Sequence, residues 1–186
     1  MIKVGGSLFD LADLGSRLQN WLESENPGQH RILFTPGGGP TTDVVRILEQ
    51  VHQTGEESSH WLALRALTLN AHFLSCLLPK SQVVSHPNDV RLPGTPHILD
   101  PYLYCLQAGE KADLPAIEPS WKSGSDYLAA HAALAGGAKK LVLLKSVSWP
   151  DEKGLALAAG QGLVDQAMPG ILAESPALPV KIICLR

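Results

Sequence analysis

Hydrophobic residues along this chain follow two alternating patterns. Short, continuous apolar stretches end at glycine or proline and predict buried strands, whereas longer segments with apolar residues every three or four positions predict amphipathic helices. The predicted strands cover residues 1–4, 31–36, 82–86, 139–147 and 180–185. The predicted helices cover residues 8–22, 41–51, 60–78, 123–136 and 163–174.

The second and third predicted helices allow more detailed expectations. Thr41 or Thr42 is expected to cap the helix at 41–51, and Ser58 or Ser59 the helix at 60–78, because a hydroxyl oxygen can accept from the first free amides. The expected core residues of these two helices are Val44, Ile47, Leu48, Val51, Trp61, Phe73, Leu74 and Leu77. Residues 87–120 are rich in proline, and only 97–100 and 101–107 indicate short elements there.

The alternation of strands and helices indicates one α/β domain over residues 1–186. Strands separated by helices normally pair in parallel, so we expect a three-layer α/β/α sandwich around a mostly parallel central sheet. In such sheets ligands bind at the carboxyl ends of the strands, where loops lead into helices. A functional site is therefore expected among the loops that follow the strands.

Composition and charge exclude several classes of protein. Hydrophobic residues make up 45% of the chain and charged residues 18%, which is typical of a folded domain. A net charge of −3 without any Lys/Arg-rich run argues against nucleic-acid binding. No apolar stretch approaches the length of a membrane span, and the early glycines and Asp10 interrupt any signal-peptide core. We therefore expect a cytoplasmic protein with neither nucleic-acid nor membrane partners.

The metal-binding residue types show no recognisable framework. Cys76, Cys105 and Cys184 are odd in number, far apart and in apolar surroundings, so they are expected to be buried thiols rather than disulfide or zinc ligands. The seven histidines show no metal-ligand spacing. No metal site formed by the protein itself is therefore expected.

Two glycine-rich segments follow the first two predicted strands, at residues 5–7 (Gly-Gly-Ser) and 36–40 (Pro-Gly-Gly-Gly-Pro). Each should open a helix, so each offers free backbone amides and a positive dipole end to an anion such as phosphate. Lys3 precedes the first glycines, and its side chain would reach the same anion. The simpler interpretations are that the glycines form tight turns and that Lys3 lies on an edge strand in water.

Several familiar motifs are absent from these loops and from the rest of the chain. No lysine directly follows Gly39, as a Walker-type phosphate loop requires, and neither loop contains G-x-G-x-x-G. The nucleophile elbow G-x-S-x-G and the zinc motif H-E-x-x-H are absent as well. The anion site therefore belongs to another class.

Three motifs together resemble the amino acid kinase superfamily, which includes acetylglutamate, aspartate, uridylate and carbamate kinases. They are Lys3-x-Gly5-Gly6-Ser7, the Pro-Gly-Gly-Gly at 36–39, and the Ser-Gly-Ser-Asp at 123–126 that opens a helix before the strand at 139–147. The chain is further similar to the aminomethylfuran-phosphate kinases of methanofuran-type cofactor synthesis. That likeness is carried by Ser59-His60, by Ser120-Trp121 with Ser125-Asp126, and by Gly162-Leu163-Val164-Asp165. The resemblance covers most of the chain and implies a phosphotransferase.

The resemblance also implies a role for each matching residue. Lys3 would neutralise the phosphoryl group in the transition state, and Asp126 would orient the active-site lysines by ion pairing. The residues implied to hold the donor phosphates are Gly5, Gly6, Ser7 and Ser146. Those implied to face the acceptor are Gly37, Gly38, Gly39, His60 and Ser125. ATP is the implied donor, with Mg²⁺ carried by its phosphates. A helix cap is the simpler interpretation of Asp126, and a structural polar role that of His60.

The nucleotide-donor half departs from the superfamily pattern. Relatives commonly follow their late strand with Asp-Val-Asp-Gly, where this chain has Lys145-Ser146-Val147-Ser148. The second lysine of these kinases is expected at Lys145, which ends a buried strand, and Lys153 is the other candidate. The domain is thus expected to be shortened on the donor side.

These features lead to one main hypothesis and two alternatives. The main hypothesis is an ATP-dependent small-molecule kinase, acting on an aminomethylfuran-phosphate-like cofactor precursor in C1 metabolism. The first alternative is a non-catalytic protein that binds a small molecule or an oxyanion on the same fold, and it is motivated by the short donor half. A uridylate-kinase-like activity is the second. The resemblance also implies a homodimer or a larger homo-oligomer.

Overall fold

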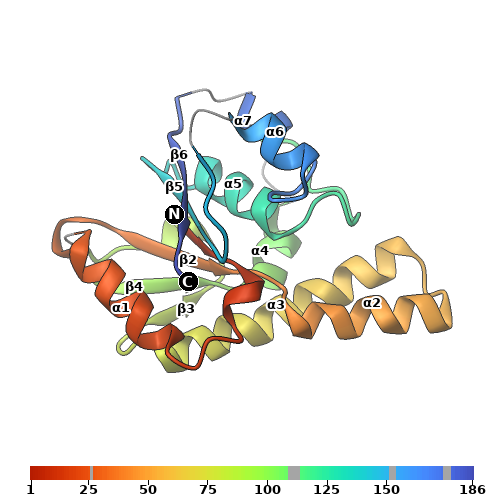
Figure 1. The fold of residues 1–186 in the computed structure, drawn as a ribbon, viewed down its shortest axis with the longest axis horizontal. Helices are drawn as coiled ribbons and strands as arrows, with labels where there is room; N and C mark the ends of the chain where they lie inside the picture. The colour runs from red at the N-terminus through yellow and green to blue at the C-terminus, as the bar shows by residue number, and fades with distance from the viewer. Residues whose placement is uncertain (26, 109–113, 151–153, 174–176) are drawn as a thin grey trace.

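A sheet of parallel strands crosses the centre of the molecule (Figure 1). The computed structural model describes residues 1–25, 27–108, 114–150, 154–173 and 177–186. Within these residues, six strands pair in parallel in the order β3-β4-β2-β1-β5-β6. Their bounds are Ile2–Val4 (β1), Ile32–Pro36 (β2), Gln82–Val84 (β3), Pro96–Leu99 (β4), Leu141–Lys145 (β5) and Val180–Cys184 (β6).

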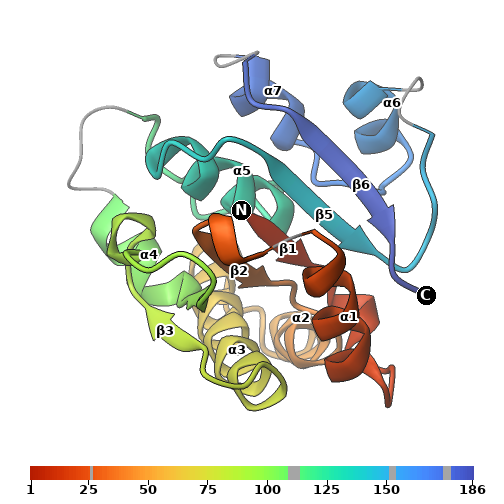
Figure 2. The same cartoon turned by 90° about the vertical axis from the view of Figure 1, so that its left-hand side faces the viewer.

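Helices cover both faces of this sheet, which confirms the predicted three-layer α/β/α sandwich. α1 and α3 lie on one face, and α5, α6 and α7 lie on the other (Figures 1 and 2). The helix bounds are Leu14–Ser24 (α1), Pro40–His52 (α2), Glu56–Leu77 (α3), Pro101–Ala108 (α4), Ser125–Ala135 (α5), Gly154–Gly160 (α6) and Met168–Ala173 (α7). Short 3-10 turns occupy Gly6–Leu8, Pro27–Gln29 and Pro87–Asp89.

Side-chain alternation along β1 explains how a lysine enters the interior. Ile2 and Val4 belong to the hydrophobic core that β1 shares with α1 and α3, which includes Leu18 and Leu74. Because successive strand side chains point to opposite faces, Lys3 points to the other side, where α5 begins, and it is only 4% exposed. β1 lies between β2 and β5, so the interpretation of Lys3 as a lysine on an edge strand is wrong.

One strand and one helix differ from the sequence prediction. Residues 96–99 form β4, an interior strand between β3 and β2, although the sequence indicated only a short element there. The helix predicted at 163–174 is confirmed only in its second half, because α6 ends at Gly160 and α7 covers Met168–Ala173. Gly162, with a φ of 72°, lies in the turn that separates them.

Several predicted helix starts are also wrong. α1 begins at Leu14, after the 3-10 turn at Gly6–Leu8. α2 begins directly after Gly39 and α3 directly after Gly55, and neither has a side-chain cap. The hydroxyl residues expected to cap these helices therefore lie inside their first turns.

The expected core face of α2 is wrong. α2 and α3 form a hairpin that extends beyond the sheet (Figure 1). The buried residues of α2 are Thr42 and Val45. The four residues predicted to lie in the core are 45–67% exposed: Val44, Ile47, Leu48 and Val51. Helical periodicity correctly indicated an apolar face, but it does not show what that face contacts.

Three further predictions of burial fail in part. Phe73 is 45% exposed on the same hairpin, although Leu74 next to it is fully buried. Among the cysteines, Cys76 is exposed and Cys184 half-buried, whereas burial raises the pKa of Cys105 to about 12.

None of the helices in the described ranges combines the length and the hydropathy needed to cross a membrane.

Candidate active site

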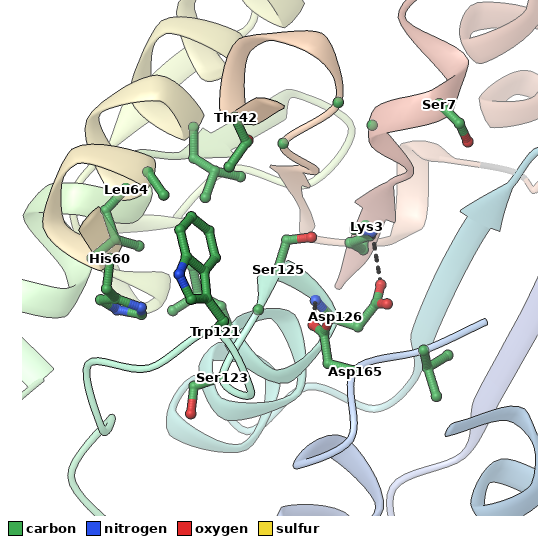
Figure 3. A pocket seen from close by; sticks show the side chains of 18 of the residues that line it. Lys3, Ser7, Thr42, His60, Leu64, Trp121, Ser123, Ser125, Asp126 and Asp165 are labelled. Atoms are coloured by element: carbon green, nitrogen blue, oxygen red, sulfur yellow. Dashed lines mark hydrogen bonds and ion pairs between the residues drawn. The ribbon is translucent and has the colours of Figure 1, made fainter. Parts of the chain in front are cut away.

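A pocket of about 250 Å³ lies where β1 and β5 end and α5 begins. One wall comes from the α2–α3 hairpin and includes Thr42 and His60, and the opposite wall comes from the sheet and α5 and includes Lys3 and Asp126 (Figure 3). This is the carboxyl edge of the parallel strands, where the sequence analysis placed the functional site.

Asp126 pairs with two lysines in this pocket. Its Oδ1 lies 2.7 Å from Lys3 Nζ, and its Oδ2 accepts a hydrogen bond of 2.7 Å from Lys145 Nζ. Burial alone would raise the pKa of Asp126, but the two lysine charges and their hydrogen bonds hold it below its ordinary value. Burial, followed by the charge of Lys3, lowers the pKa of Lys145 from 10.5 to about 8. The fold thus brings together the three residues expected to be catalytic.

The two glycine loops pack against each other through their backbones. A Cβ atom on Gly6 would collide with the backbone of Gly39, and one on Gly37 would collide with the backbone of Gly6. Gly39 also has a φ of 56°, a conformation that other residues rarely adopt. Close contact between the loops therefore explains these glycines without reference to a ligand.

Some amides of these loops remain available. The amide of Gly5 donates to the Leu144 carbonyl (2.8 Å), and that of Gly37 donates to the Val4 carbonyl (2.7 Å). No hydrogen bond among the described residues uses the amides of Gly38 or Gly39, and both glycines line the pocket. The second loop therefore retains donors that a bound anion can use.

Asn70 holds the second glycine loop and Thr42 lies beside it, and the sequence analysis identified neither as a site residue. Asn70 on α3 is 4% exposed, and its Nδ2 donates to the carbonyls of Gly37 and Gly38 (both 2.8 Å) and to Thr41 Oγ1 (2.9 Å). Thr42 lines the pocket, and its buried Oγ1 has no hydrogen-bond partner in the described part of the chain. An asparagine in an apolar helical stretch was the one available signal for Asn70.

Asp165 is a further acidic residue in the pocket wall. Its Oδ2 accepts hydrogen bonds from the backbone amides of Asp126 (2.6 Å) and Tyr127 (3.1 Å) at the start of α5. Burial, followed by the nearby charge of Asp126, raises the pKa of Asp165. The sequence placed Asp165 in a motif but assigned it no role, because no local pattern links residues 39 positions apart.

Apolar and aromatic side chains also line the pocket and form a surface beside the ion cluster. It is formed by Leu64 and Leu67 of α3, by Leu128 and by Trp121. Two residues of α2 hold the Trp121 ring, since Glu49 Oε2 accepts from its Nε1 (2.7 Å) and the Arg46 guanidinium lies 4.9 Å from the ring centroid. The loop before α5 is thereby fixed to the α2–α3 hairpin.

His60 joins the same loop to α3. A carbonyl oxygen can only accept, so His60 Nδ1 carries the proton and donates to the Ser120 carbonyl (3.1 Å). Burial lowers the pKa of His60, which favours the neutral ring with Nε2 as an acceptor. The structure therefore gives His60 a structural contact as well as a place in the pocket wall.

The predicted site residues divide into two groups. Those that line the pocket are Lys3, Gly6, Ser7, Gly38, Gly39, His60, Ser125, Asp126 and Lys145. The remaining three, Gly5, Gly37 and Ser146, are not among the lining residues, although Ser146 Oγ is 2.9 Å from Ser7 Oγ. Lys153, the other candidate for the second lysine, lies outside the described residues. No group of three or more His, Cys, Asp or Glu side chains in the described ranges is arranged to hold a metal ion.

Known structures share this fold, although sequence comparison gives no relatives. No protein-family model matches the chain. No curated protein matches it either. The chain is similar to the uridylate kinase of Archaeoglobus fulgidus, with a TM-score of 0.65 and 14% identity over 99% of this chain and 91% of that one. It is also similar to the aspartate kinase of Synechocystis (TM-score 0.65, 13% identity, 97% of this chain and 37% of that one). A third similar structure is the UMP kinase of Bacillus anthracis (TM-score 0.60, 12% identity, 99% and 86%).

These similarities concern the fold. Uridylate and aspartate kinases are members of the amino acid kinase superfamily, and the all-parallel sheet with helices on both faces matches theirs. At 12–14% identity the likeness shows a common architecture, and the chemistry of the site has to be argued from its own residues.

Proposed function

We propose that this protein is an ATP-dependent phosphotransferase that transfers a phosphoryl group to a small-molecule acceptor. The observation that carries the proposal is the buried cluster of Lys3, Asp126 and Lys145, in which two cations converge at a pocket. Beside it is a glycine loop with two amides that have no partner among the described residues. Phosphoryl transfer requires positioning and charge stabilisation rather than covalent catalysis by the protein, and this cluster is suited to both.

The pocket offers the groups that phosphate oxygens require. Bound Mg-ATP would supply the phosphoryl group and the metal ion. Lys3 would neutralise charge on that group, and Lys145 would do so from the donor side, while Asp126 keeps both ammonium groups in place. The amides of Gly38 and Gly39 and the unpaired hydroxyl of Thr42 are further donors with no competing partner among the described residues. Asp126 thus orients the lysines in this proposal and does not serve mainly as a helix cap.

The acceptor side of the pocket favours a small molecule with an apolar or aromatic body. Leu64, Leu67, Leu128 and Trp121 present carbon atoms to the pocket, and His60 offers one ring nitrogen. An aminomethylfuran-phosphate-like cofactor precursor in C1 metabolism fits this combination of ring and phosphate, and it remains our proposed acceptor. UMP belongs in the same acceptor panel, because two of the similar structures are uridylate kinases.

A non-catalytic role has one observation in its favour. The pocket volume of about 250 Å³ lies below the usual range for ligand pockets, which begins at roughly 300 Å³. Such a pocket suits one small molecule or oxyanion better than an acceptor and a nucleotide together. In the phosphotransferase proposal, the base and ribose lie outside it, on a donor side that we propose is shortened within a single amino acid kinase-like domain.

Calorimetric titration of Mg-ATP into the wild type and into Lys3→Met tests the proposal. We expect micromolar binding by the wild type, at least tenfold weaker binding by the variant, and ADP formation with one member of the acceptor panel. Loss of this preorganised charge should lower kcat by about 10²–10³-fold. Lys181→Met, which removes an exposed lysine of β6, is the matched control and should change neither quantity. Oxyanion or furan binding without nucleotide binding at millimolar ATP would favour the non-catalytic alternative.

We further propose that the protein is cytoplasmic and that it is a homodimer or a larger homo-oligomer. Val44, Ile47, Leu48 and Val51 form an exposed apolar stripe along α2, with Leu69 and Phe73 also exposed on α3. Contiguous apolar surface of this kind commonly marks a protein interface. Sedimentation equilibrium at tens of micromolar tests this proposal, and a strictly monomeric mass would contradict it.

A further inference from the structure

We propose that Asp165 is the positioning residue of the site, acting through the first turn of α5 to hold Asp126 between Lys3 and Lys145. The effect that we expect on catalysis rests on the proposed phosphoryl transfer. The effect on the geometry of the ion cluster does not depend on that function. The segment at issue is Gly162–Asp165, which lies between α6 and α7 and borders the pocket.

The carboxylate of Asp165 takes the place of a helix cap. The N-cap residue of α5 is Gly124, which has no side chain to accept from the free amides of the first turn. Asp165 Oδ2 accepts from two of them, those of Asp126 (2.6 Å) and Tyr127 (3.1 Å). A carboxylate at a helix N-terminus is favoured by both hydrogen bonding and the helix dipole. The backbone that carries the Asp126 side chain is therefore fixed by a residue remote in sequence.

The same segment also holds one of the lysines. The carbonyl of Leu163 accepts a hydrogen bond of 2.8 Å from Lys145 Nζ, which donates at the same time to Asp126 Oδ2 (2.7 Å). Residues 163–165 thus contact both partners of the Lys145–Asp126 ion pair. The Leu163 carbonyl contacts the Lys145 side chain, and the Asp165 side chain contacts the Asp126 backbone. Figure 3 shows the Asp165 and Asp126 side chains next to each other on the wall that Lys3 also faces.

Gly124 provides independent support for this contact. Its φ of −80° lies in a region open to any residue, so backbone strain does not require glycine there. A Cβ atom at this position would instead collide with both carboxylate oxygens of Asp165. Glycine at 124 therefore allows Asp165 to approach the start of α5, and Gly124→Ala should displace the carboxylate without removing it.

The competing interpretation is that Asp165 caps α5 for stability alone. Asp100 provides the matched comparison, because it is also buried (5% exposed) and its Oδ1 accepts from the Leu103 amide (3.1 Å) in the first turn of α4, away from the pocket. Both carboxylates contribute a cap, but only Asp165 is joined to the ion cluster. Loss of stability is expected for either residue, whereas loss of turnover is expected for Asp165 alone.

The experiment compares Asp165→Ala, Asp165→Asn, Gly124→Ala and Asp100→Ala, each assayed well below its own melting temperature. With the acceptor identified as above, Asp165→Ala and Gly124→Ala should lower kcat at least 30-fold and change KM for ATP less than threefold. Asp165→Asn keeps an oxygen that can accept both amides, so it should restore most of the turnover. Asp100→Ala should lower the melting temperature and leave kcat unchanged. A kcat of Asp165→Ala within threefold of the wild type, or equal losses in the alanine and asparagine variants, would overturn the proposal.

A second readout does not depend on turnover. In NMR spectra of selectively labelled protein, the side-chain carboxyl of Asp126 should protonate only below the ordinary range of an aspartate in the wild type, in Asp165→Asn and in Asp100→Ala. In Asp165→Ala it should protonate at a higher pH than in the wild type, because Asp126 is no longer held against both lysines. If the wild type shows no turnover but the variants show these differences in Asp126 ionisation, the proposed function is refuted and the role of Asp165 is upheld. Unchanged ionisation of Asp126 in Asp165→Ala refutes that role.

Discussion

The low pKa of Lys145 predicts a specific pH dependence of stability. The Lys145 side chain is only 11% exposed, and burial together with the charge of Lys3 lowers the pKa of its ammonium group from 10.5 to about 8. The folded protein therefore releases this proton near pH 8, whereas the unfolded chain keeps it until about pH 10.5. Between these values the unfolded state binds more protons, so the contribution of Lys145 to stability rises with pH.

The size of this effect follows from the linkage relation. One unit of pKa difference corresponds to about 1.4 kcal/mol, and the proton is only partly released at pH 8. The contribution of Lys145 should therefore increase by about 1 kcal/mol between pH 8 and pH 9. Other groups titrate in the same range, so the quantity to measure is the difference in unfolding free energy between the wild type and Lys145→Met. The contributions of groups that the substitution does not affect cancel in that difference.

Urea denaturation of the two proteins at pH 6.5, 7.5, 8 and 9 provides the measurement. We expect the free energy of unfolding of the wild type, relative to Lys145→Met, to increase by about 1 kcal/mol from pH 8 to pH 9 and to change by about 0.3 kcal/mol or less from pH 6.5 to pH 7.5. Lys181→Met, at an exposed position of β6, should show no such slope relative to the wild type. A flat or falling difference for Lys145→Met would show that the amine keeps its proton to higher pH and would refute the reasoning.

Two further substitutions test the second glycine loop. Asn70→Ala leaves the buried carbonyl of Gly37 and the partly buried carbonyl of Gly38 without their shared donor, so urea denaturation should show a loss of about 2–3 kcal/mol in unfolding free energy. A loss under about 0.5 kcal/mol would contradict this account. Thr42→Val replaces a buried hydroxyl that has no partner in the described ranges with a methyl group of similar size, so stability should be unchanged or slightly higher. Calorimetry should show at least threefold weaker Mg-ATP binding by Thr42→Val, and unaltered affinity would exclude the hydroxyl as a ligand donor.

The sequence was most informative where local chemistry and topology agree. Lys3 before the glycines, Asp126 at a helix start and Lys145 at a strand end could be placed at one site, because parallel strands end at a common edge. The same reasoning did not reveal Asn70 or Asp165, since each acts on a loop or a helix that is distant in the sequence. Their roles arise from tertiary contacts, for which no local pattern exists.

The errors in the fold prediction have a similar origin. β4 is short and follows a proline-rich stretch, so its interior place in the sheet arises from pairing with β2 and β3 rather than from its own propensity. The apolar stripe of α2 was assigned to the core because periodicity shows that a face is apolar but not what covers it. The glycine loops were attributed to ligand approach, and the structure adds contact between the loops as a sufficient reason for several of these glycines.

The pairing of β1 with β5 has a consequence for how the protein is made. Ile2 lies opposite Val142, so the strand that leaves the ribosome early waits for one synthesised much later. Until β5 arrives, β1 has only β2 beside it and the ion cluster lacks Lys145, and parallel pairing over such a separation is slow. A nascent chain therefore contains both glycine loops but no ion cluster. Arrest of synthesis before residue 126 would leave the site without any carboxylate to pair with Lys3, rather than with a weakened one.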